Sequence, residues 1–317
     1  MIACIGDLMV DVFPDGPAGE RRHPGGKAAI YAVTARALGS PVAVLGSVGT
    51  DEDGRAVAGI LQRAGVDISG IVKREGTPTG ADYFEENGWR MERGANWELA
   101  ADDVEVGLAR LLDGGVEVDA VIVNQGIPLE ASQAAVRFAR DRGLFLVLHL
   151  GPEAIEARRK VDPAFYPLAD VIVVSRREAD VLAEHLGLDT EGRSDEVVAR
   201  MLFDGTRPRW ALLLSFGVGG AHVVAHRPDG VHEAAVAPSS GPDHEAEKYI
   251  GANDTAVAAW VTWLVSGATP PADQDFDAVR DLLDRAVRLA AVNLVHPGPL
   301  TAAVLHSADF VAGASVT

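Results

Sequence analysis

Short apolar segments of strand length alternate with helix-like segments along most of the chain. The strand-like segments are residues 2–6, 42–48, 120–123, 144–150, 170–175, 210–215, 221–225 and 231–236. The helix-like segments are residues 27–38, 53–64, 129–140, 153–160, 177–186, 252–266 and 277–295. Strands that alternate with helices form parallel sheets whose two faces are covered by helices. The sequence therefore predicts an α/β fold in three layers, α/β/α, with a mostly parallel central sheet.

Residues 77–98 differ in character from the rest of the chain. Aromatic and polar residues alternate there around Asn87-Gly88, a dipeptide typical of two-residue hairpin turns. Residues 14–24 are rich in proline, glycine and charged residues, which indicates an exposed loop or excursion. We expect a β-hairpin that stands apart from the main sheet, together with part of the excursion at 11–24.

The charge balance of the chain excludes several classes of partner. The 317 residues include 46 acidic and 28 basic side chains, which gives a net charge of −18 at pH 7. Such a charge repels nucleic acid and anionic membrane surfaces, so we expect neither as a partner. No segment has the apolar length needed to cross a bilayer, and the N-terminus lacks the features of a signal peptide. We therefore expect a cytoplasmic protein.

The chain offers few metal ligands in recognisable patterns. Cys4 is the only cysteine and lies in an apolar run, so we expect a small core residue rather than a disulfide or a cysteine-based metal cluster. The histidines are scattered without the spacing of a zinc site.

Polar residues follow several of the predicted strands. In α/β sheets, ligands gather beyond the carboxyl ends of the strands, so one pocket is expected to collect these side chains. They are Asp7, Asp11, Gln125, His149, Ser175 and Gly217.

The segment Gly251-Ala252-Asn253-Asp254 opens an apolar, helix-like run. The free N–H groups at a helix start and the helix dipole favour an anion there. A carboxylate beside such a site is suited to act as a base that activates a hydroxyl for attack on a phosphoryl group. From these residues alone, an ordinary helix start with Asn253 or Asp254 as its cap is the favoured interpretation.

Five segments, in order, resemble the motifs of the ribokinase-like (PfkB) family of sugar kinases, and together they extend over nearly the whole chain. They are GDLMVDVF (6–13), PGGKAAIYAVTARALG (24–39), VAVLGSVGTDEDGRAVAGILQRAGVD (42–67), SFGVGGA (215–221) and GANDTAVAAW (251–260). The resemblance implies one ribokinase-like domain over residues 1–317, with a small β lid formed by about 12–24 and 77–98.

The same resemblance implies a reaction and its residues. Family members transfer the γ-phosphoryl group of ATP to a hydroxyl of a sugar or similar alcohol, with Mg²⁺ bridging the phosphates. Asp254 would be the catalytic base, and the N–H groups of Gly251, Ala252 and Asn253 would form the anion hole. The implied substrate-binding residues are Asp7, Asp11, Gly25, Gly26 and Lys27. The implied nucleotide-binding residues are Ser215, Gly217 and Gly220, and Glu178 would organise Mg²⁺ indirectly, through water.

The sequence also departs from the family pattern. Lys248, Tyr249 and Ile250 precede Gly251 where members commonly have Asp-Thr, so the resemblance leaves open whether the chain has the monovalent-cation site of some members. The other departures are Asn253 in place of a glycine, Ile30 in place of a sugar-binding asparagine, and Ser175 in place of the asparagine of an N-x-x-E motif.

The leading hypothesis is an ATP-dependent kinase, fructokinase-like or ribokinase-like, that acts on a sugar hydroxymethyl group. A catalytically weak relative that binds a sugar or nucleotide as a regulatory or binding module is one alternative, and a nucleoside kinase is another. The resemblance also implies a possible homodimer formed through the lid.

Overall fold

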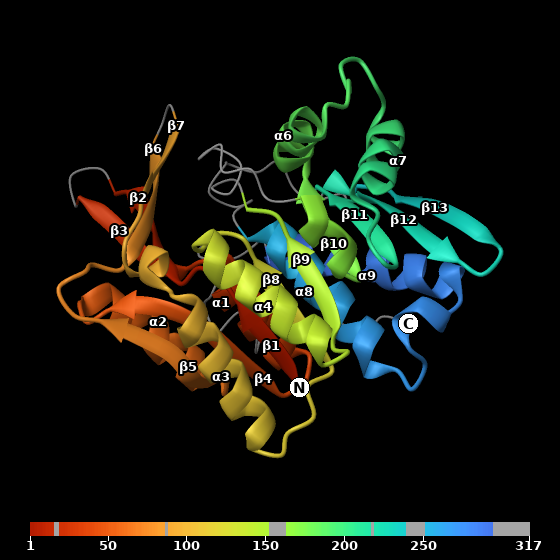
Figure 1. Ribbon diagram of the computed structural model, residues 1–317. Coiled ribbons are helices and arrows are strands. Elements are labelled where there is room, and N and C mark those ends of the chain that lie inside the picture. The colour runs from red at the N-terminus through yellow and green to blue at the C-terminus, as the bar shows by residue number, and fades with distance from the viewer. Residues whose placement is uncertain (16–18, 86–87, 152–162, 217–218, 239–250, 294–317) are drawn as a thin grey trace.

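The computed structural model describes residues 1–15, 19–85, 88–151, 163–216, 219–238 and 251–293. Nine strands form the central sheet, in the order β13-β12-β11-β10-β9-β8-β1-β4-β5 (Figure 1). All neighbours pair in parallel from β5 to β11, and β12 is antiparallel to both β11 and β13. The strands are β1 (Ile2–Ile5), β4 (Val42–Gly49), β5 (Asp67–Arg74), β8 (Ala120–Asn124), β9 (Phe145–His149), β10 (Val171–Ser175), β11 (Ala211–Ser215), β12 (Ala221–Arg227) and β13 (Gly230–Val236).

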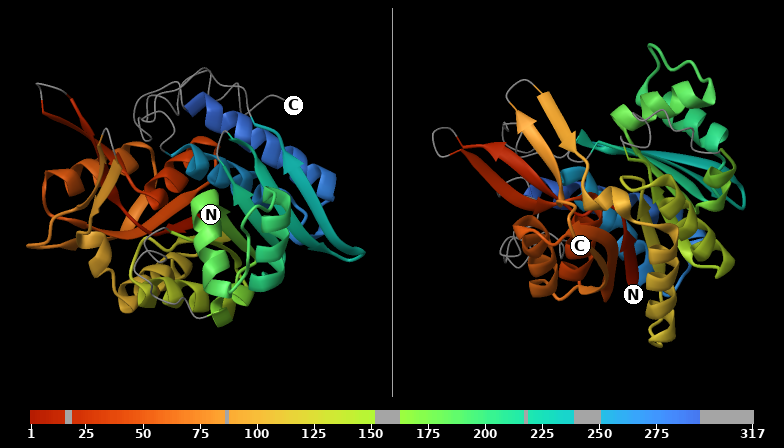
Figure 2. Two further views of the ribbon diagram at one scale, coloured as in Figure 1. Left: turned by 90° about the horizontal axis from the view of Figure 1, so that it is seen from above. Right: turned by 60° about the vertical axis from the view of Figure 1, so that its left-hand side comes forward.

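Helices cover both faces of this sheet (Figures 1 and 2). One face carries α1 (Lys27–Ala37), α2 (Glu52–Arg63), α8 (Ala252–Ser266) and α9 (Phe276–Asn293). The other face carries α3 (Ala101–Asp113), α4 (Leu129–Asp141), α6 (Arg176–Leu186) and α7 (Asp195–Thr206). Alternate residues of β1 enter the two cores: Ile2 and Cys4 pack on the first side, and Ala3 and Ile5 on the second. The three layers predicted from the alternation are thus confirmed.

Two helices, α3 and α7, fall where the sequence analysis assigns no element. In α3 the buried residues are Val104, Gly107, Leu108 and Leu111, which is the spacing of one helix face. The periodic signal was therefore present, but a glycine in mid-helix weakens it. The predicted helix at 153–160 lies outside the described residues.

A second, four-stranded sheet stands beside the central one and forms the lid, in the order β3-β2-β6-β7 (Figure 2). Its strands are β2 (Met9–Pro14), β3 (Glu20–Gly25), β6 (Gly80–Glu85) and β7 (Gly88–Glu92). The hairpin predicted around Asn87-Gly88 appears as the antiparallel pair β6–β7, whose turn residues 86–87 lie outside the described part. The pair β2–β6 is parallel, so the lid is a mixed sheet.

The expectation of a loop over residues 14–24 is wrong for its second half, because Glu20–Gly25 is a strand paired with β2. This strand lies at the edge of the lid, where Pro24 is tolerated because one side of the strand needs no ladder hydrogen bonds.

Three short 3₁₀ helices complete the described elements: Ala95–Glu98, Pro163–Leu168 and Pro271–Asp273. Cys4 is fully buried in the core, as predicted. Within the described ranges, no helix combines the length and the apolar character that a membrane crossing needs.

Candidate active site

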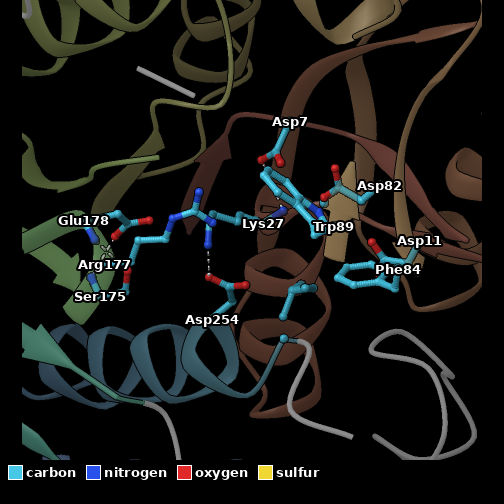
Figure 3. A pocket seen from close by; sticks show the side chains of 13 residues that line it. Asp7, Asp11, Lys27, Asp82, Phe84, Trp89, Ser175, Arg177, Glu178 and Asp254 are labelled. Carbon is cyan, nitrogen blue, oxygen red and sulfur yellow. Dashed lines mark hydrogen bonds and ion pairs between the residues drawn. The ribbon is translucent and has the colours of Figure 1, made fainter. Parts of the chain in front are cut away.

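A cavity of about 300 Å³ lies between the lid, the start of α1 and the start of α8 (Figure 3). Five carboxylates and two cationic side chains line it: Asp7, Asp11, Asp82, Glu178 and Asp254, with Lys27 and Arg177. Figure 3 shows Asp254 and Lys27 between two groups of residues, with Ser175, Arg177 and Glu178 on one side and Asp11, Asp82, Phe84 and Trp89 on the other.

The start of α8 places Asp254 on the cavity wall. Gly251 precedes the helix with φ +77°, a left-handed conformation that suits glycine, and Asp254 is the third helical residue. Because Gly251 occupies the cap position, the alternative of Asn253 or Asp254 as a helix cap is wrong. Among the described residues other than glycine, only Arg207 has a positive φ, so Asn253 needs no strained backbone where the family has glycine.

The first turn of α8 leaves backbone donors available. The N–H of Thr255 bonds to the carbonyl of Gly251 at 2.8 Å, which is the first bond of the helical ladder. The N–H groups of Ala252, Asn253 and Asp254 therefore have no acceptor within the helix. Together with the helix dipole they make this end of the cavity suited to an anion.

Asp254 is buried, with only 6% of its surface exposed. The Lys27 Nζ donates to its Oδ1 at 3.1 Å, and the Tyr31 hydroxyl donates to the same oxygen at 3.4 Å. Among the described residues, these contacts engage Oδ1 and leave Oδ2 without a protein partner. The carboxylate is thus oriented by two residues of α1 and keeps one oxygen for a ligand.

Lys27 is held as a cation by the carboxylates that surround it. Burial opposes its charge, but Asp254, Glu178 and Asp7 outweigh burial and raise the pKa of Lys27. Lys27 is therefore neither a free surface lysine nor a proton donor near neutral pH.

The glycine pair before α1 lets three segments approach closely. Gly26 has φ +92°, and a Cβ there would lie 2.5 Å from the carbonyl oxygen of Asp7. The N–H of Lys27 donates to Asp7 Oδ1 at 3.2 Å, which fixes the start of α1. A Cβ on Gly25 would lie 2.4 Å from Asp11 Oδ2, so the lid strand packs directly on this glycine.

His149, at the end of β9, is fully buried beneath the cavity floor. Its Nδ1 shares a hydrogen bond with the Tyr31 hydroxyl and lies 4.0 Å from Asp254 Oδ1. Its Nε2 is 3.4 Å from Glu178 Oε2, an ion-pair distance without hydrogen-bond geometry. His149 therefore connects the Asp254 region to Glu178 through the interior and does not line the cavity.

Glu178 has a structural role besides the one that the family resemblance implies. Its carboxylate accepts from the Ser175 N–H at 2.7 Å, and the Ser175 hydroxyl accepts from the Glu178 N–H, which makes a capping box at the start of α6. Burial disfavours the charge of Glu178, but His149 and Lys27 outweigh burial and lower its pKa. The side chain is an ionised carboxylate on the cavity wall.

The lid contributes carboxylates that face the same cavity. Asp11 on β2 pairs with Asp82 on β6 in the parallel register. Burial, together with Asp82, Asp7 and Asp254, raises the pKa of Asp11, and burial and Asp7 raise that of Asp82 to about 7. Phe84 and Trp89 are paired across the hairpin and also line the cavity.

Four lining residues were missed by sequence reasoning: Asp82, Phe84, Trp89 and Arg177. The two-residue period of β6 already placed Asp82 and Phe84 on one face of the hairpin. What the sequence lacked was the pairing of β2 with β6, which turns that face toward Asp11.

The residues predicted for the nucleotide lie outside the lining of this cavity. Ser215 is buried at the end of β11, in register with Ser175, so its turn adjoins the cavity. Gly220 has φ +98°, and the Phe216 N–H bonds to its carbonyl at 3.0 Å, which closes a tight turn. Gly217 and the segment Lys248–Ile250 lie outside the described residues.

Other predicted residues also lie off the cavity surface. The cavity collects Asp7, Asp11, Gly26, Lys27, Ser175, Glu178, Gly251 and Asp254. Residues that do not line it are Gly25, Gln125, His149, Ala252 and Asn253.

A divalent metal here would rest mostly on the phosphates of a ligand. The described residues contain no group of three histidine, cysteine, aspartate or glutamate side chains placed to hold a metal ion. Mg²⁺ usually keeps several waters and takes one or two carboxylates together with substrate phosphates. Glu178, an ionised carboxylate on the wall beside the α8 start, fits that mode of binding.

Solved structures of known proteins share this fold. A ribokinase from Giardia lamblia superposes with a TM-score of 0.76 at 19% identity, covering 99% of both chains. A fructokinase from Xylella fastidiosa with bound ATP superposes with a TM-score of 0.74 at 20% identity, covering 95% of this chain and 94% of that one. The predicted ribokinase-like fold is confirmed.

Sequence comparison adds curated relatives. The 5-dehydro-2-deoxygluconokinase of Shouchella clausii is 26% identical over 261 residues, which cover 78% of this chain and 75% of the relative. Fructokinase-1 of Zea mays is 28% identical over 241 residues, which cover 68% of this chain and 69% of the relative. The ribokinase of Haemophilus influenzae is 26% identical over 184 residues, with 56% of each chain covered. Residues 1–304 match the model of the pfkB family carbohydrate kinases, and the chain therefore belongs to that family of kinases.

Proposed function

We propose that this kinase transfers the γ-phosphoryl group of ATP to a hydroxymethyl group of a sugar, in a fructokinase-like or ribokinase-like reaction, with Asp254 as the general base. The observation that carries the proposal is the placement of Asp254, a buried carboxylate on the cavity wall in the first turn of α8. A base must reach the substrate proton and an acceptor for developing phosphoryl charge must lie beside it. The start of α8 supplies both.

Asp254 would take the hydroxyl proton on Oδ2, since Oδ1 is engaged by Lys27 and Tyr31. Those two contacts fix the plane of the carboxylate before the substrate arrives. A base that is already oriented loses less freedom when the reacting atoms come together. Lys27 and Tyr31 are thus positioning residues in this proposal.

The backbone N–H groups of Gly251, Ala252 and Asn253 would hold the charge that develops on the transferred group. They belong to the start of α8, where the helix dipole adds partial positive charge. Removal of one preorganised donor of this kind costs roughly 10²–10³ in rate in other enzymes. The left-handed Gly251 is therefore as important to the reaction as the carboxylate.

Asp254 lies between the lid side of the cavity and the side that carries Ser175 and Glu178. We place the sugar at the lid side, with Asp7, Asp11, Gly26 and Lys27 as its contacts, and the nucleotide on the side of Ser175 and Ser215. Gly25 does not line the cavity, so its contact with the substrate stays a prediction. Mg²⁺, when bound, would offset phosphate charge there, with Glu178 holding it through water. Three further points stay predictions: nucleotide binding by Gly217 and Gly220, the doubtful monovalent-cation site, and a homodimer formed through the lid.

The test is ATP consumption against a panel of sugars and nucleosides. We expect turnover of at least one sugar, and a loss of roughly 10²–10⁴ in kcat in Asp254→Asn. Asp277→Asn is the matched control, because Asp277 also lies in the first turn of a helix but is exposed and does not line the cavity. Full turnover by Asp254→Asn would refute the assignment of the base. A sugar that raises the melting temperature while no compound is turned over would support the binding-only alternative instead.

A further inference from the structure

The lid side of the cavity carries two neighbouring carboxyl groups, Asp11, which is buried, and Asp82, which is half-buried and bonds to the Trp89 side chain. Asp11 and Asp82 face each other across β2 and β6, and both line the cavity. Asp11 is only 3% exposed. Within the described residues, Asp11 Oδ2 and Asp82 Oδ1 accept no hydrogen bond, and neither side chain forms an ion pair. Buried polar groups are nearly always satisfied in folded proteins, so a buried carboxyl on the cavity wall that bonds to none of the described residues, Asp11, points to a missing ligand.

Among the described residues, Lys27 favours the ionised forms of Asp11 and Asp82, but burial and the neighbouring carboxylates outweigh it. Lys27 is engaged by Asp254 at 3.1 Å, and the Arg177 guanidinium lies 5.7 Å from the Trp89 ring. Burial and the neighbouring carboxylates raise the pKa values of both Asp11 and Asp82. A ligand that brings a cation to the pair would remove this unfavourable interaction.

The chemistry of the wall narrows the class of ligand. An anionic sugar acid would meet two carboxylates and be repelled. A metal ion is disfavoured, since the described residues form no cluster of three suitable ligands. A neutral hydroxyl supplies one donor and no charge, whereas an ammonium group supplies three donors and a positive charge.

Two aromatic rings beside the carboxylates favour the same ligand. Phe84 and Trp89 pair across the β6–β7 hairpin, and both face the cavity next to Asp82 (Figure 3). A cation beside an aromatic face gains further attraction, most of all when water is excluded.

We propose that Asp11 and Asp82 bind the amino group of an amino sugar, so that the substrates of this kinase carry a primary amine at the end that faces the lid. The inference rests on the proposed function in placing the sugar on the lid side. The binding of the amine itself does not require turnover.

The test measures binding by calorimetry at pH 7.5, without ATP, for two matched pairs of probes: D-glucosamine with D-glucose, and 1-amino-1-deoxy-D-fructose with D-fructose. We expect the amino member of at least one pair to bind roughly tenfold or more tightly than its hydroxyl partner, because hydrogen bonds to charged groups are the stronger kind. Asp82→Asn should abolish that preference. If the Asp82→Asn variant does not fold, Asp82→Ser replaces it in the same measurement.

Glu92→Gln is the matched control. It also removes one negative charge from the lid, on the neighbouring strand β7, but Glu92 is exposed and does not line the cavity. We expect it to keep the preference for the amine.

The proposal is overturned if neither amino sugar binds the unmodified protein more tightly than its hydroxyl partner, or if Asp82→Asn keeps the preference. Because these measurements contain no ATP, they are independent of the Asp254→Asn assay. If the protein turns over neutral sugars but no amino sugar, the proposed reaction is supported and only the amino-sugar inference is contradicted.

Discussion

The ion pair between Lys27 and Asp254 offers a quantitative test of how the site is held together. Lys27→Met keeps the length of the side chain and removes its charge. The Lys27 side chain is 22% exposed and that of Asp254 8%, so the pair is largely shielded from water. Lys27 also faces Glu178 and Asp7, and its loss leaves three carboxylates together without their shared cation.

The size of the expected loss of stability follows from the distance between Lys27 Nζ and Asp254 Oδ1 and from the burial of both side chains. At 3.1 Å and an effective dielectric constant near 20, the attraction is roughly 5 kcal/mol before desolvation is counted. Breaking a buried pair by removing one partner costs about 3–5 kcal/mol, so we expect Lys27→Met to lower the free energy of unfolding by about 3 kcal/mol. Asp254→Asn should cost less, because Lys27 keeps Glu178 and Asp7 as neighbours.

The assay is a double-mutant cycle in urea at pH 7 with Lys27→Met, Asp254→Asn and the double variant. We expect a coupling energy of at least about 1.5 kcal/mol, within the range found for groups in direct contact. A coupling below about 0.5 kcal/mol would mean that the two charges do not stabilise each other. The view of Lys27 as the residue that orients the base would then fail.

Two further predictions concern the same cavity. Gly26→Ala should lower the free energy of unfolding by at least about 2 kcal/mol, because φ is +92° and the new Cβ would lie 2.5 Å from the Asp7 carbonyl oxygen. The control Gly39→Ala, at φ +94° with open space around it, should lower it by only about 1–2 kcal/mol. Equal losses for the two variants in urea unfolding would contradict the argument that Gly26 is needed for the close approach to Asp7. Asp82→Asn should change the pH dependence of stability. The folded-state pKa of Asp82 is raised from 3.8 to about 7, so the folded protein binds more protons than the unfolded chain between these pH values. The free energy of unfolding of the unmodified protein therefore falls by up to about 4 kcal/mol as the pH rises from 4 to 7. The variant lacks this loss, so its advantage over the unmodified protein should grow with pH in that window, and a constant difference would count against the raised pKa.

The layers of the fold were predictable because each depends on local periodicity. The alternation of strands and helices shows in the sequence, and the two cores follow from alternate residues of β1 pointing to opposite faces. α3 was missed although its buried face has helical spacing, since Gly107 interrupts the apolar stripe. Gly107 lets α3 pack closely on β4, because a Cβ there would lie 2.6 Å from the Leu45 side chain, which would have to move.

The site was predictable only in part, for a different reason. Asp254, Lys27, Asp7 and Asp11 lie in segments that resemble family motifs, and the cavity brings all four together. Asp82 lies in no such motif. Its place opposite Asp11 depends on the pairing of strands about seventy residues apart, which no local pattern specifies. The same holds for His149, whose contacts with Tyr31 and Glu178 join three separate elements.

The distribution of charge within the cavity differs between its two sides. On the lid side, Asp11 and Asp82 form no ion pair with any described residue, and their negative charge repels anions. On the other side, the charge of Glu178 is engaged by the Ser175 N–H, Arg177 lines the wall, and the N–H groups at the start of α8 lie between the two. A molecule with phosphates at one end and a hydroxyl-rich or amine-bearing molecule therefore have opposite preferences for the two sides. We infer that a protein of net charge −18 accepts a polyanion here because the carboxylates near the phosphates, Glu178 and Asp254, are offset by Lys27 and by backbone N–H groups.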